Sequence, residues 1–320
     1  MEVRLPDTAP DRPLTLSRFL RGMICLFVLL STAFFMLVYY GFVSAAVVRI
    51  FSVHYSRKAT SFFFGSWLTL WCFLFEKVNK TRVVFSGESV PDNERILLIA
   101  NHRTEVDWMY LWNLALRKNS IGYVRYILKS SLMKIPVFGW AFFILEFIPV
   151  QRRWEVDETA LRRMLSSFRT PRDPFWLVLF PEGTDFNKNK CTKNQEFAAE
   201  NGLPIMSNVL LPKSKGFHSC LKELNGHLDA VYDVTIGYKF RPPSLMDNAL
   251  GVAPAEVHMH VKRIPAGEFP ATEKECAAWL MSAFQKKDEM LSGFYAKGCF
   301  PEEGREGDLS AIQGIWNLVV

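Results

Sequence analysis

The longest run without a charged residue, from Gly22 to Val48, constrains the fold of this chain most. Its 27 residues exceed the roughly 20 that an α-helix needs to cross the core of a bilayer. The run is too long for a signal peptide and lacks a clean small-residue cleavage site. A second uncharged run, Ala59 to Phe75, has 17 residues and suits either a short crossing or an interfacial or re-entrant helix. The two runs together predict a helical membrane hairpin.

The orientation of this hairpin is predicted from its basic residues. Seven flank the two runs and three lie in the link between them, which favours cytosolic ends and a lumenal link. The flanking residues are Arg4, Arg12, Arg18, Arg21, Lys77, Lys80 and Arg82, and those of the link are Arg49, Arg57 and Lys58. If the second run does not return across the membrane, the hairpin would instead lie in one leaflet or the domain would face the lumen.

After the hairpin, apolar strand patterns alternate with helical patterns. This alternation predicts an α/β domain with a mixed, mostly parallel sheet flanked by helices. The expected strands are 83–85, 96–100, 124–128, 143–150, 175–180, 206–211, 231–238 and 257–261, and the expected helices 105–117, 131–140, 156–168, 194–201, 217–224 and 272–295. We divide the chain into a polar tail (1–17), a membrane-anchoring hairpin (18–80), one domain (81–300) and a C-terminal tail (301–320).

The composition fits a protein that contacts lipid. The 320 residues include 27 Phe and 9 Trp, and the net charge of +6 implies attraction to anionic lipid or phosphate rather than to nucleic acid. The six cysteines form no Cys-x-x-Cys pair, so we expect six reduced thiols. No Gly-rich phosphate loop occurs, and no third ligand is spaced to join His258 and His260, so we predict no metal and no nucleotide cofactor.

The first candidate site follows the expected strand at 96–100. His102 and Asp107 stand five residues apart across a polar turn. A neutral imidazole can take a proton from a hydroxyl near pH 7, and a carboxylate on its other nitrogen fixes the tautomer and stabilises the imidazolium. The pair therefore resembles two parts of a catalytic triad whose nucleophile comes from the substrate. The alternative is a helix N-terminal turn capped by Asn101 or Thr104.

The second candidate site follows the expected strand at 175–180. This strand runs into Pro181, Glu182, Gly183 and Thr184. Gly183 permits a close backbone approach, and its N–H is a candidate donor to an anion. The alternative is an ordinary strand-terminating turn in which Pro181 stops the strand.

The two motifs, Asn-His-x4-Asp and Phe-Pro-Glu-Gly-Thr, together resemble those of the glycerolipid acyltransferase family, over about residues 75–300. Within the family the chain is similar to the plant 1-acyl-sn-glycerol-3-phosphate acyltransferases and to the lysocardiolipin acyltransferase branch. The resemblance implies that His102 is a general base oriented by Asp107. It further implies substrate-binding roles, which we assign to Asn101, Arg152, Pro181, Glu182, Gly183 and Thr184.

One of these assignments, Arg152, has an alternative, and a neighbouring position, Asp185, departs from the family pattern. Arg152 follows an apolar run and matches the basic residue of the family's second motif, yet Arg152 and Arg153 also suit a pair of solvated charges. Asp185 stands where many members have Arg, so a carboxylate that repels phosphate replaces a guanidinium that would grip it. This departure leaves the headgroup of the acceptor open. Lys188, Lys190 and Lys193 follow closely and offer compensating charge or a solvated basic loop.

The resemblance implies a membrane-bound enzyme of the endoplasmic reticulum, multi-pass, with a cytosolic catalytic domain. Its partners would be acyl-CoA, a lysophospholipid acceptor and the bilayer. We expect it to move an acyl group from acyl-CoA, a substrate rather than a cofactor, to the free hydroxyl of lysophosphatidic acid, giving phosphatidic acid. Acyl remodelling of lysocardiolipin or lysophosphatidylinositol is the alternative reaction. The non-enzyme alternative is an inactive, membrane-bound lipid-binding scaffold.

Overall fold

The computed structural model describes residues 11–135, 138–169 and 173–301. Its centre is a seven-stranded sheet with the order β1-β7-β6-β2-β5-β3-β4. Every strand pair is parallel except β6 with β7, which confirms the expected mixed, mostly parallel sheet. The strands are β1 (Arg82–Gly87), β2 (Arg95–Ala100), β3 (Val124–Lys129), β4 (Ile148–Val150), β5 (Phe175–Leu179), β6 (Ala230–Tyr238) and β7 (Glu256–Pro265).

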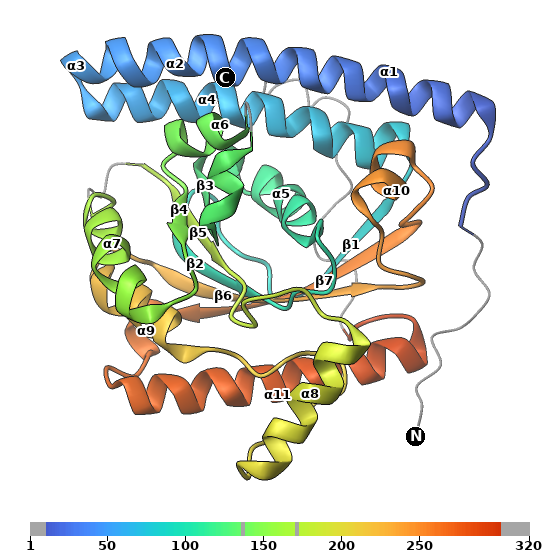
Figure 1. The fold of residues 1–320 in the computed structure, drawn as a ribbon, viewed down its shortest axis with the longest axis vertical. Coiled ribbons are helices and arrows are strands. Elements are labelled where there is room, and N and C mark those ends of the chain that lie inside the picture. Colours follow the sequence, from blue (N-terminus) through green and yellow to red (C-terminus); the bar gives the residue numbers. More distant parts are fainter. Residues whose placement is uncertain (1–10, 136–137, 170–172, 302–320) are drawn as a thin grey trace.

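Helices cover both faces of this sheet (Figure 1). In β2, Ile96, Leu98 and Ala100 pack with residues of α4 and α5 on one face. Leu97 and Ile99 pack on the other face with residues of α7, α9 and α11. A strand buried on both faces explains why residues 96–100 are apolar without interruption. The domain's helices are α5 (Asp107–Arg117), α6 (Phe138–Ile144), α7 (Trp154–Ser166), α8 (Lys188–Glu200), α9 (Ser214–Glu223), α10 (Leu245–Leu250) and α11 (Glu273–Lys297), with 3₁₀ turns η4 (Ile121–Tyr123), η5 (Ser130–Lys134) and η6 (Ala266–Glu268).

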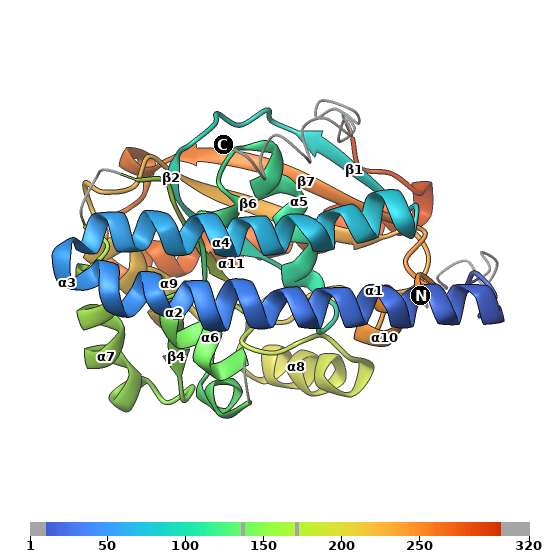
Figure 2. The ribbon, with the colours of Figure 1, turned by 90° about the horizontal axis from the view of Figure 1, so that it is seen from above.

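Two N-terminal helices run antiparallel, side by side, across one side of the domain (Figures 1 and 2). The first is continuous from Leu16 to Phe51 and is long and apolar enough to cross a membrane. Its parts are α1 (Leu16–Ala33), η1 (Phe34–Tyr40), α2 (Gly41–Val43), η2 (Ser44–Val48) and α3 (Arg49–Phe51). Extended backbone at Ser52 ends it, and the Ser52 hydroxyl caps the second helix by accepting from the Tyr55 N–H. The second helix is α4 (Val53–Phe73), continued by η3 (Leu74–Val78).

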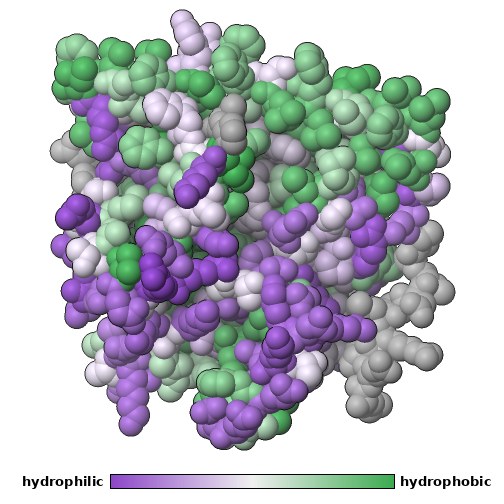
Figure 3. Space-filling view, in the orientation of Figure 1, coloured by the Kyte–Doolittle hydropathy of each residue, from purple (hydrophilic) through white to green (hydrophobic). Residues whose placement is uncertain are grey.

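The two helices differ in what surrounds them. Hydrogen bonds from the Ser56 hydroxyl to the Ser44 carbonyl (2.7 Å) and from the Trp67 indole to the Leu29 carbonyl (2.9 Å) join them. Helix α4 packs against both the first helix and the domain and is largely buried, whereas the first helix exposes many large apolar side chains. Figure 3 shows this apolar surface as a band along the hairpin edge, above a mainly polar domain.

Two expected strands differ from the structure. Residues 206–211 form no strand, because side-chain oxygens rather than a neighbouring strand take their amide protons: Asp288 accepts from Ser207 and Asn208, and Asn194 from Leu211. The expected strand 143–150 is reduced to β4, because α6 extends through its first residues to Ile144. The helix expected at 131–140 is divided between η5 and the start of α6. Short apolar runs do not distinguish a buried strand from a buried helix by periodicity.

Candidate active site

Both sequence motifs lie at the carboxyl edge of the parallel strands. Strands β2 and β5 are neighbours in parallel register, with Ile99 opposite Leu179. The loops that leave these two strands therefore start side by side, and they carry His102 and Glu182. The structure thus brings together two motifs that lie eighty residues apart in the chain.

His102 and Asp107 form a hydrogen-bonded pair. The His102 Nδ1 lies 2.9 Å from the Asp107 Oδ2. The imidazole is 20% exposed, whereas the carboxylate is completely buried. Among the residues that the structure describes, His102 Nε2 has no hydrogen-bond partner, so this nitrogen is available to a substrate hydroxyl. The His102 ring also stacks on Phe180, with ring centroids 4.4 Å apart.

Both oxygens of Asp107 are held in place. Oδ2 also accepts the backbone N–H groups of Arg103 (2.5 Å) and Thr104 (2.8 Å). Oδ1 accepts the hydroxyl of Tyr238, the last residue of β6, at 2.6 Å. Asp107 is also the first residue of α5, where the helix dipole favours a negative charge. The His–Asp pair thus stands at a helix start, but neither Asn101 nor Thr104 caps this helix: its N-cap residue is Val106, which makes no side-chain cap, and the Thr104 hydroxyl donates to the Pro243 carbonyl.

Glu182 links the two motif loops. Its Oε1 accepts the His102 N–H at 2.6 Å, and its Oε2 accepts the Leu210 N–H at 2.9 Å. The side chain is buried, and burial is the main reason why its pKa rises to about 8, with the two N–H bonds opposing the rise. In this arrangement Glu182 acts on the backbone of the His102 loop, because both its oxygens face peptide N–H groups.

Gly183 adopts a backbone conformation that favours glycine. Its φ of +71° lies in the left-handed region, and a Cβ there would come 3.4 Å from the Lys213 Nζ. Its N–H donates to the Phe180 carbonyl at 3.0 Å and so closes the turn. The absence of a side chain at Gly183 lets the Lys213 ammonium lie over the turn.

The carboxylate of Asp185 is paired with a cation. Lys190 Nζ lies 2.9 Å from its Oδ1 and also donates to the Asp185 carbonyl and the Thr184 hydroxyl. Partial burial alone would raise the pKa of Asp185, but the bonds from Lys190 outweigh burial and lower it. Of the three nearby lysines, Lys190 thus supplies the compensating charge.

Three other residues to which we assigned substrate-binding roles form hydrogen bonds within the protein. The Asn101 amide, 1% exposed, both donates to and accepts from the backbone of Ile236, so it continues the pairing of β2 with β6 beyond Ala100. Pro181 is buried, and its carbonyl accepts the Lys213 N–H at 2.9 Å. Thr184 is bonded through its hydroxyl to Lys190.

Arg152 lies farther along the same edge. It follows β4, which is three strand positions from β2, a separation of about 14 Å between strand axes. Its side chain is exposed and has no hydrogen bond within the described part of the chain, and its φ is +64°. Arg152 would reach a ligand at His102 only along the edge of the sheet.

Three residues near the site were not predicted from the sequence. Tyr238 is an ordinary apolar-strand residue by pattern, and Lys213 and Arg103 are ordinary surface charges. The Arg103 guanidinium lies 4.2 Å from the Phe186 ring centroid and donates to the Asn208 carbonyl. Nothing local marks these residues, because their neighbours come from distant segments.

The remaining candidates do not form a metal site. Among the described residues no group of three or more His, Cys, Asp and Glu side chains is placed to hold a metal ion. His258 is buried, with Nε2 2.7 Å from Glu256, and His260 bonds to the Ser86 hydroxyl. All six cysteines are free thiols.

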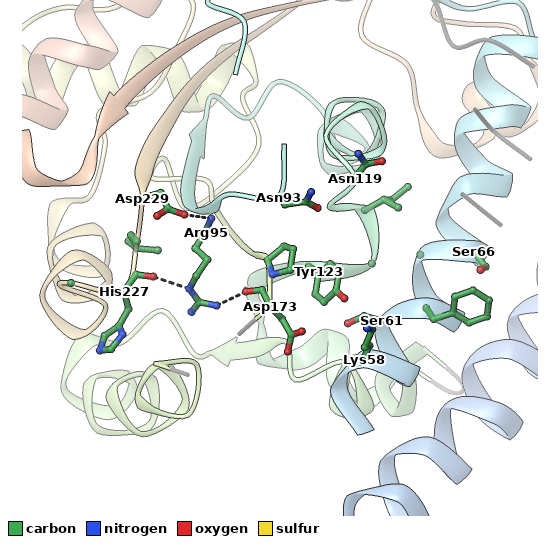
Figure 4. Close-up of a pocket in the computed structure, with 17 residues that line it drawn as sticks. Lys58, Ser61, Ser66, Asn93, Arg95, Asn119, Tyr123, Asp173, His227 and Asp229 are labelled. Carbon is green, nitrogen blue, oxygen red and sulfur yellow. Dashed lines mark hydrogen bonds between the residues drawn. The ribbon is translucent and has the colours of Figure 1, made fainter. Parts of the chain in front are cut away.

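A cavity of about 780 Å³ lies at the opposite, amino edge of the sheet, against α4 (Figure 4). Arg95 lines this cavity: its backbone N–H donates to the Asp229 carboxylate, and its guanidinium donates to the carbonyls of His227, Asp173 and Phe168. The Arg95 donors are therefore used within the protein. None of the expected site residues lines this cavity, so it is separate from the His102 pair.

The fold and the site define an α/β protein with a hydrogen-bonded His–Asp pair at the carboxyl edge of its sheet, an arrangement that suits general-base chemistry. A family model described as "Acyltransferase" matches residues 67–239, more than half of the chain, and one described as "Acyltransferase C-terminus" matches residues 248–319. The chain belongs to the acyltransferase family.

Proteins similar to this chain carry acyltransferase names. The chain is 63% identical over 306 residues to the Arabidopsis thaliana protein named "Probable 1-acyl-sn-glycerol-3-phosphate acyltransferase 5", covering 96% of this chain and 82% of that protein. It is 39% identical over 254 residues to lysocardiolipin acyltransferase 1 of Gallus gallus, covering 78% and 67%. With 1-acyl-sn-glycerol-3-phosphate acyltransferase 2 of Brassica oleracea it shares 36% identity over 209 residues, covering 65% and 54%.

Proposed function

We propose that this protein transfers an acyl group from acyl-CoA to the free hydroxyl of lysophosphatidic acid, giving phosphatidic acid, with His102 as the general base. The observation that carries the proposal is the buried Asp107 carboxylate 2.9 Å from Nδ1 of a partly exposed His102. This contact keeps the proton on Nδ1 and leaves Nε2 as the acceptor. The names of the relatives supply the substrate class.

The proposed reaction needs no covalent enzyme intermediate. The acceptor hydroxyl gives its proton to His102 Nε2 while its oxygen bonds to the thioester carbonyl carbon. The tetrahedral intermediate then collapses, the carbon–sulfur bond breaks, and the leaving thiolate takes the proton from the imidazolium. Asp107 stabilises the imidazolium between these two steps, and Glu182 holds the backbone of the loop.

The phosphate of the acceptor requires a cation at the site. Because Lys190 neutralises Asp185, this carboxylate does not present an uncompensated charge. Lys213 lies over the Gly183 turn and, within the described chain, has no hydrogen bond to its ammonium, so we propose Lys213 as the nearest phosphate ligand. Arg152 is a more distant one. Lys213 would equally bind the phosphate of another lysophospholipid in which a phosphate lies near the reacting hydroxyl.

We further propose that the protein is bound to a membrane, that of the endoplasmic reticulum. The exposed apolar helix Leu16–Phe51 supports membrane binding. Helix α4 lies along the domain over its length, about 32 Å for 21 residues. This packing favours an arrangement in which both helices lie in one leaflet over one in which both cross the membrane. We place the domain on the cytosolic side, where acyl-CoA is available.

The test is transfer from radiolabelled oleoyl-CoA by membranes that contain wild type, His102→Ala or His218→Ala. Each is offered lysophosphatidic acid, lysocardiolipin, lysophosphatidylinositol and lysophosphatidylcholine. His218 lies on α9, outside the site, and serves as the matched control. We expect His102→Ala to lose about a hundredfold or more of the activity, as for removal of a general base, and His218→Ala to retain it.

The acceptor panel decides between the alternatives. Highest activity with lysophosphatidic acid supports the proposed reaction. A preference for lysocardiolipin or lysophosphatidylinositol would show instead that the reaction is acyl remodelling. The similarity to lysocardiolipin acyltransferases is the reason for including this alternative. Wild-type membranes no more active than empty ones would favour the lipid-binding scaffold.

A further inference from the structure

We propose that Tyr238 is a positioning residue for the reaction: its hydroxyl fixes the Asp107 carboxylate and thereby sets the orientation and basicity of His102. The inference rests on the proposed function, because it assigns a partner to the proposed base. Tyr238 contacts neither His102 nor, in the proposed reaction, the reacting atoms, so it acts only through Asp107.

The contact is short and fully buried. Tyr238 Oη lies 2.6 Å from Asp107 Oδ1, and Tyr238 is 1% exposed. The other carboxylate oxygen, Oδ2, is already shared by His102 and two backbone N–H groups. Tyr238 therefore supplies the only side-chain bond to Oδ1 among the described residues. Without it the carboxylate would be held on one oxygen and could rotate about its Cβ–Cγ bond.

Tyr238 is itself firmly placed. It is the last residue of β6 and is paired with Val257 of β7. Its ring packs edge-on against Tyr110, with centroids 5.9 Å apart. Burial, and then the charge of Asp107, raise the pKa of the Tyr238 hydroxyl well above its usual value, so it remains a hydrogen-bond donor at any working pH.

The electrostatic consequence has a definite sign. A donor to a carboxylate stabilises its charged form and reduces its affinity for a proton. Asp107 bonded to Tyr238 therefore stabilises the His102 imidazolium less than a free carboxylate would. Removal of the hydroxyl should stabilise the imidazolium and move the acid limb of the kcat/KM profile to higher pH. The other charged or titratable groups that face the pair are Glu182, Arg103, Tyr110 and Tyr295.

Tyr110 provides a matched control. It is also a fully buried tyrosine, and its hydroxyl donates to Asn248 Oδ1 at 2.7 Å instead of to Asp107. Tyr110→Phe and Tyr238→Phe each delete one buried hydroxyl and keep the ring. A general effect of packing would affect both variants alike, whereas the proposed role affects Tyr238→Phe alone.

The experiment measures kcat, KM for the lysophospholipid and the pH profile of kcat/KM for the full chain in membranes. For Tyr238→Phe we expect kcat to fall about tenfold or more, the range for loss of a hydrogen bond to a charged group. We also expect an unchanged KM and an acid limb displaced to higher pH. Tyr110→Phe should keep the wild-type acid limb. A Tyr238→Phe profile indistinguishable from that of Tyr110→Phe would overturn the inference.

A second substitution protects the test against a folding defect in Tyr238→Phe. Difluorotyrosine at position 238 keeps the shape of the side chain and makes the hydroxyl a stronger donor. The acid limb should then move to lower pH, opposite to the phenylalanine variant, and an unmoved limb would contradict the inference. If instead His102→Ala retains wild-type activity, the assignment of the base is wrong, whatever Tyr238 does.

Discussion

At the scale of single residues, Glu182 joins the two motif loops through a buried carboxyl group. The family motif places it in acceptor binding, whereas its two oxygens hold the His102 and Leu210 N–H groups. The main cost of this arrangement is desolvation of the carboxyl group, which raises its pKa to about 8. A carboxyl group that gains a proton more readily in the folded state links stability to pH.

We expect Glu182 to make the folded protein less stable as pH rises from about 4.5 to about 8. The folded-state pKa lies above the unfolded value, so its contribution is complete below pH 4.5 and is lost as pH rises. The slope is at most about 1.4 kcal/mol per pH unit. Thermal unfolding of the detergent-solubilised protein between about pH 5 and pH 8 should show this slope reduced in Glu182→Gln.

Glu182→Gln separates the effect of the ionisable group on the pH dependence of stability from the effect of its hydrogen bonds, which does not depend on pH. The amide introduced by Glu182→Gln would present an NH₂ group to one of the two backbone N–H groups, at a cost of about 1–3 kcal/mol at every pH. Glu196→Gln on the exposed face of α8 is the control and should keep the wild-type slope. An unchanged slope in Glu182→Gln would show that another group carries the pH dependence.

At the scale of elements, local patterns predicted the parts of the site but not their partners. The turn after β2 was predictable, because an apolar run followed by polar residues and a helical pattern lies within residues 96–117. The contact of Glu182 with Leu210 and that of Asp107 with Tyr238 were not, since each joins segments whose distance in space depends on sheet order. The sequence also left open whether the second apolar run crosses a membrane; in the structure α4 packs against the domain and the first helix.

Helix α4 depends on two glycines for this packing. A Cβ on Gly122 would lie 2.1 Å from the Ser61 carbonyl oxygen, and one on Gly65 would lie 3.0 Å from the Gly122 Cα. Gly122→Ala should therefore push α4 from the domain and lower the free energy of unfolding by about 1–3 kcal/mol. Gly293→Ala on α11, which has no atom within 4 Å of its Cβ, should be neutral or slightly stabilising.

Thermal unfolding in detergent measures both variants, and limited proteolysis near Ser52 reports whether α4 has loosened. Equal stability of Gly122→Ala and Gly293→Ala would show that α4 tolerates displacement, and the close contact would then carry little of the stability.

At the scale of the whole molecule, the arrangement of the hairpin determines how the domain meets a bilayer. Many residues of α4 between Ser56 and Cys72 are buried against the domain and the first helix. A crossing by α4 would bring its own Arg57 and the polar domain surface beside it, including Arg95 and Asp173, into the hydrocarbon. Burial of such charges without water is costly. Helices lying in one leaflet avoid this cost and keep the link beside the domain on one side of the membrane.

Lys58, exposed near the start of α4, distinguishes the two arrangements. In the one-leaflet arrangement, Lys58→Cys should react with a membrane-impermeant maleimide in sealed microsomes. The yield should match that of Phe197→Cys on the domain's exposed α8, and detergent should not increase it. The wild type gives the background from the six native thiols. If Lys58→Cys reacts only after detergent opens the vesicles, the link is lumenal, and α4 must leave the domain to cross the membrane.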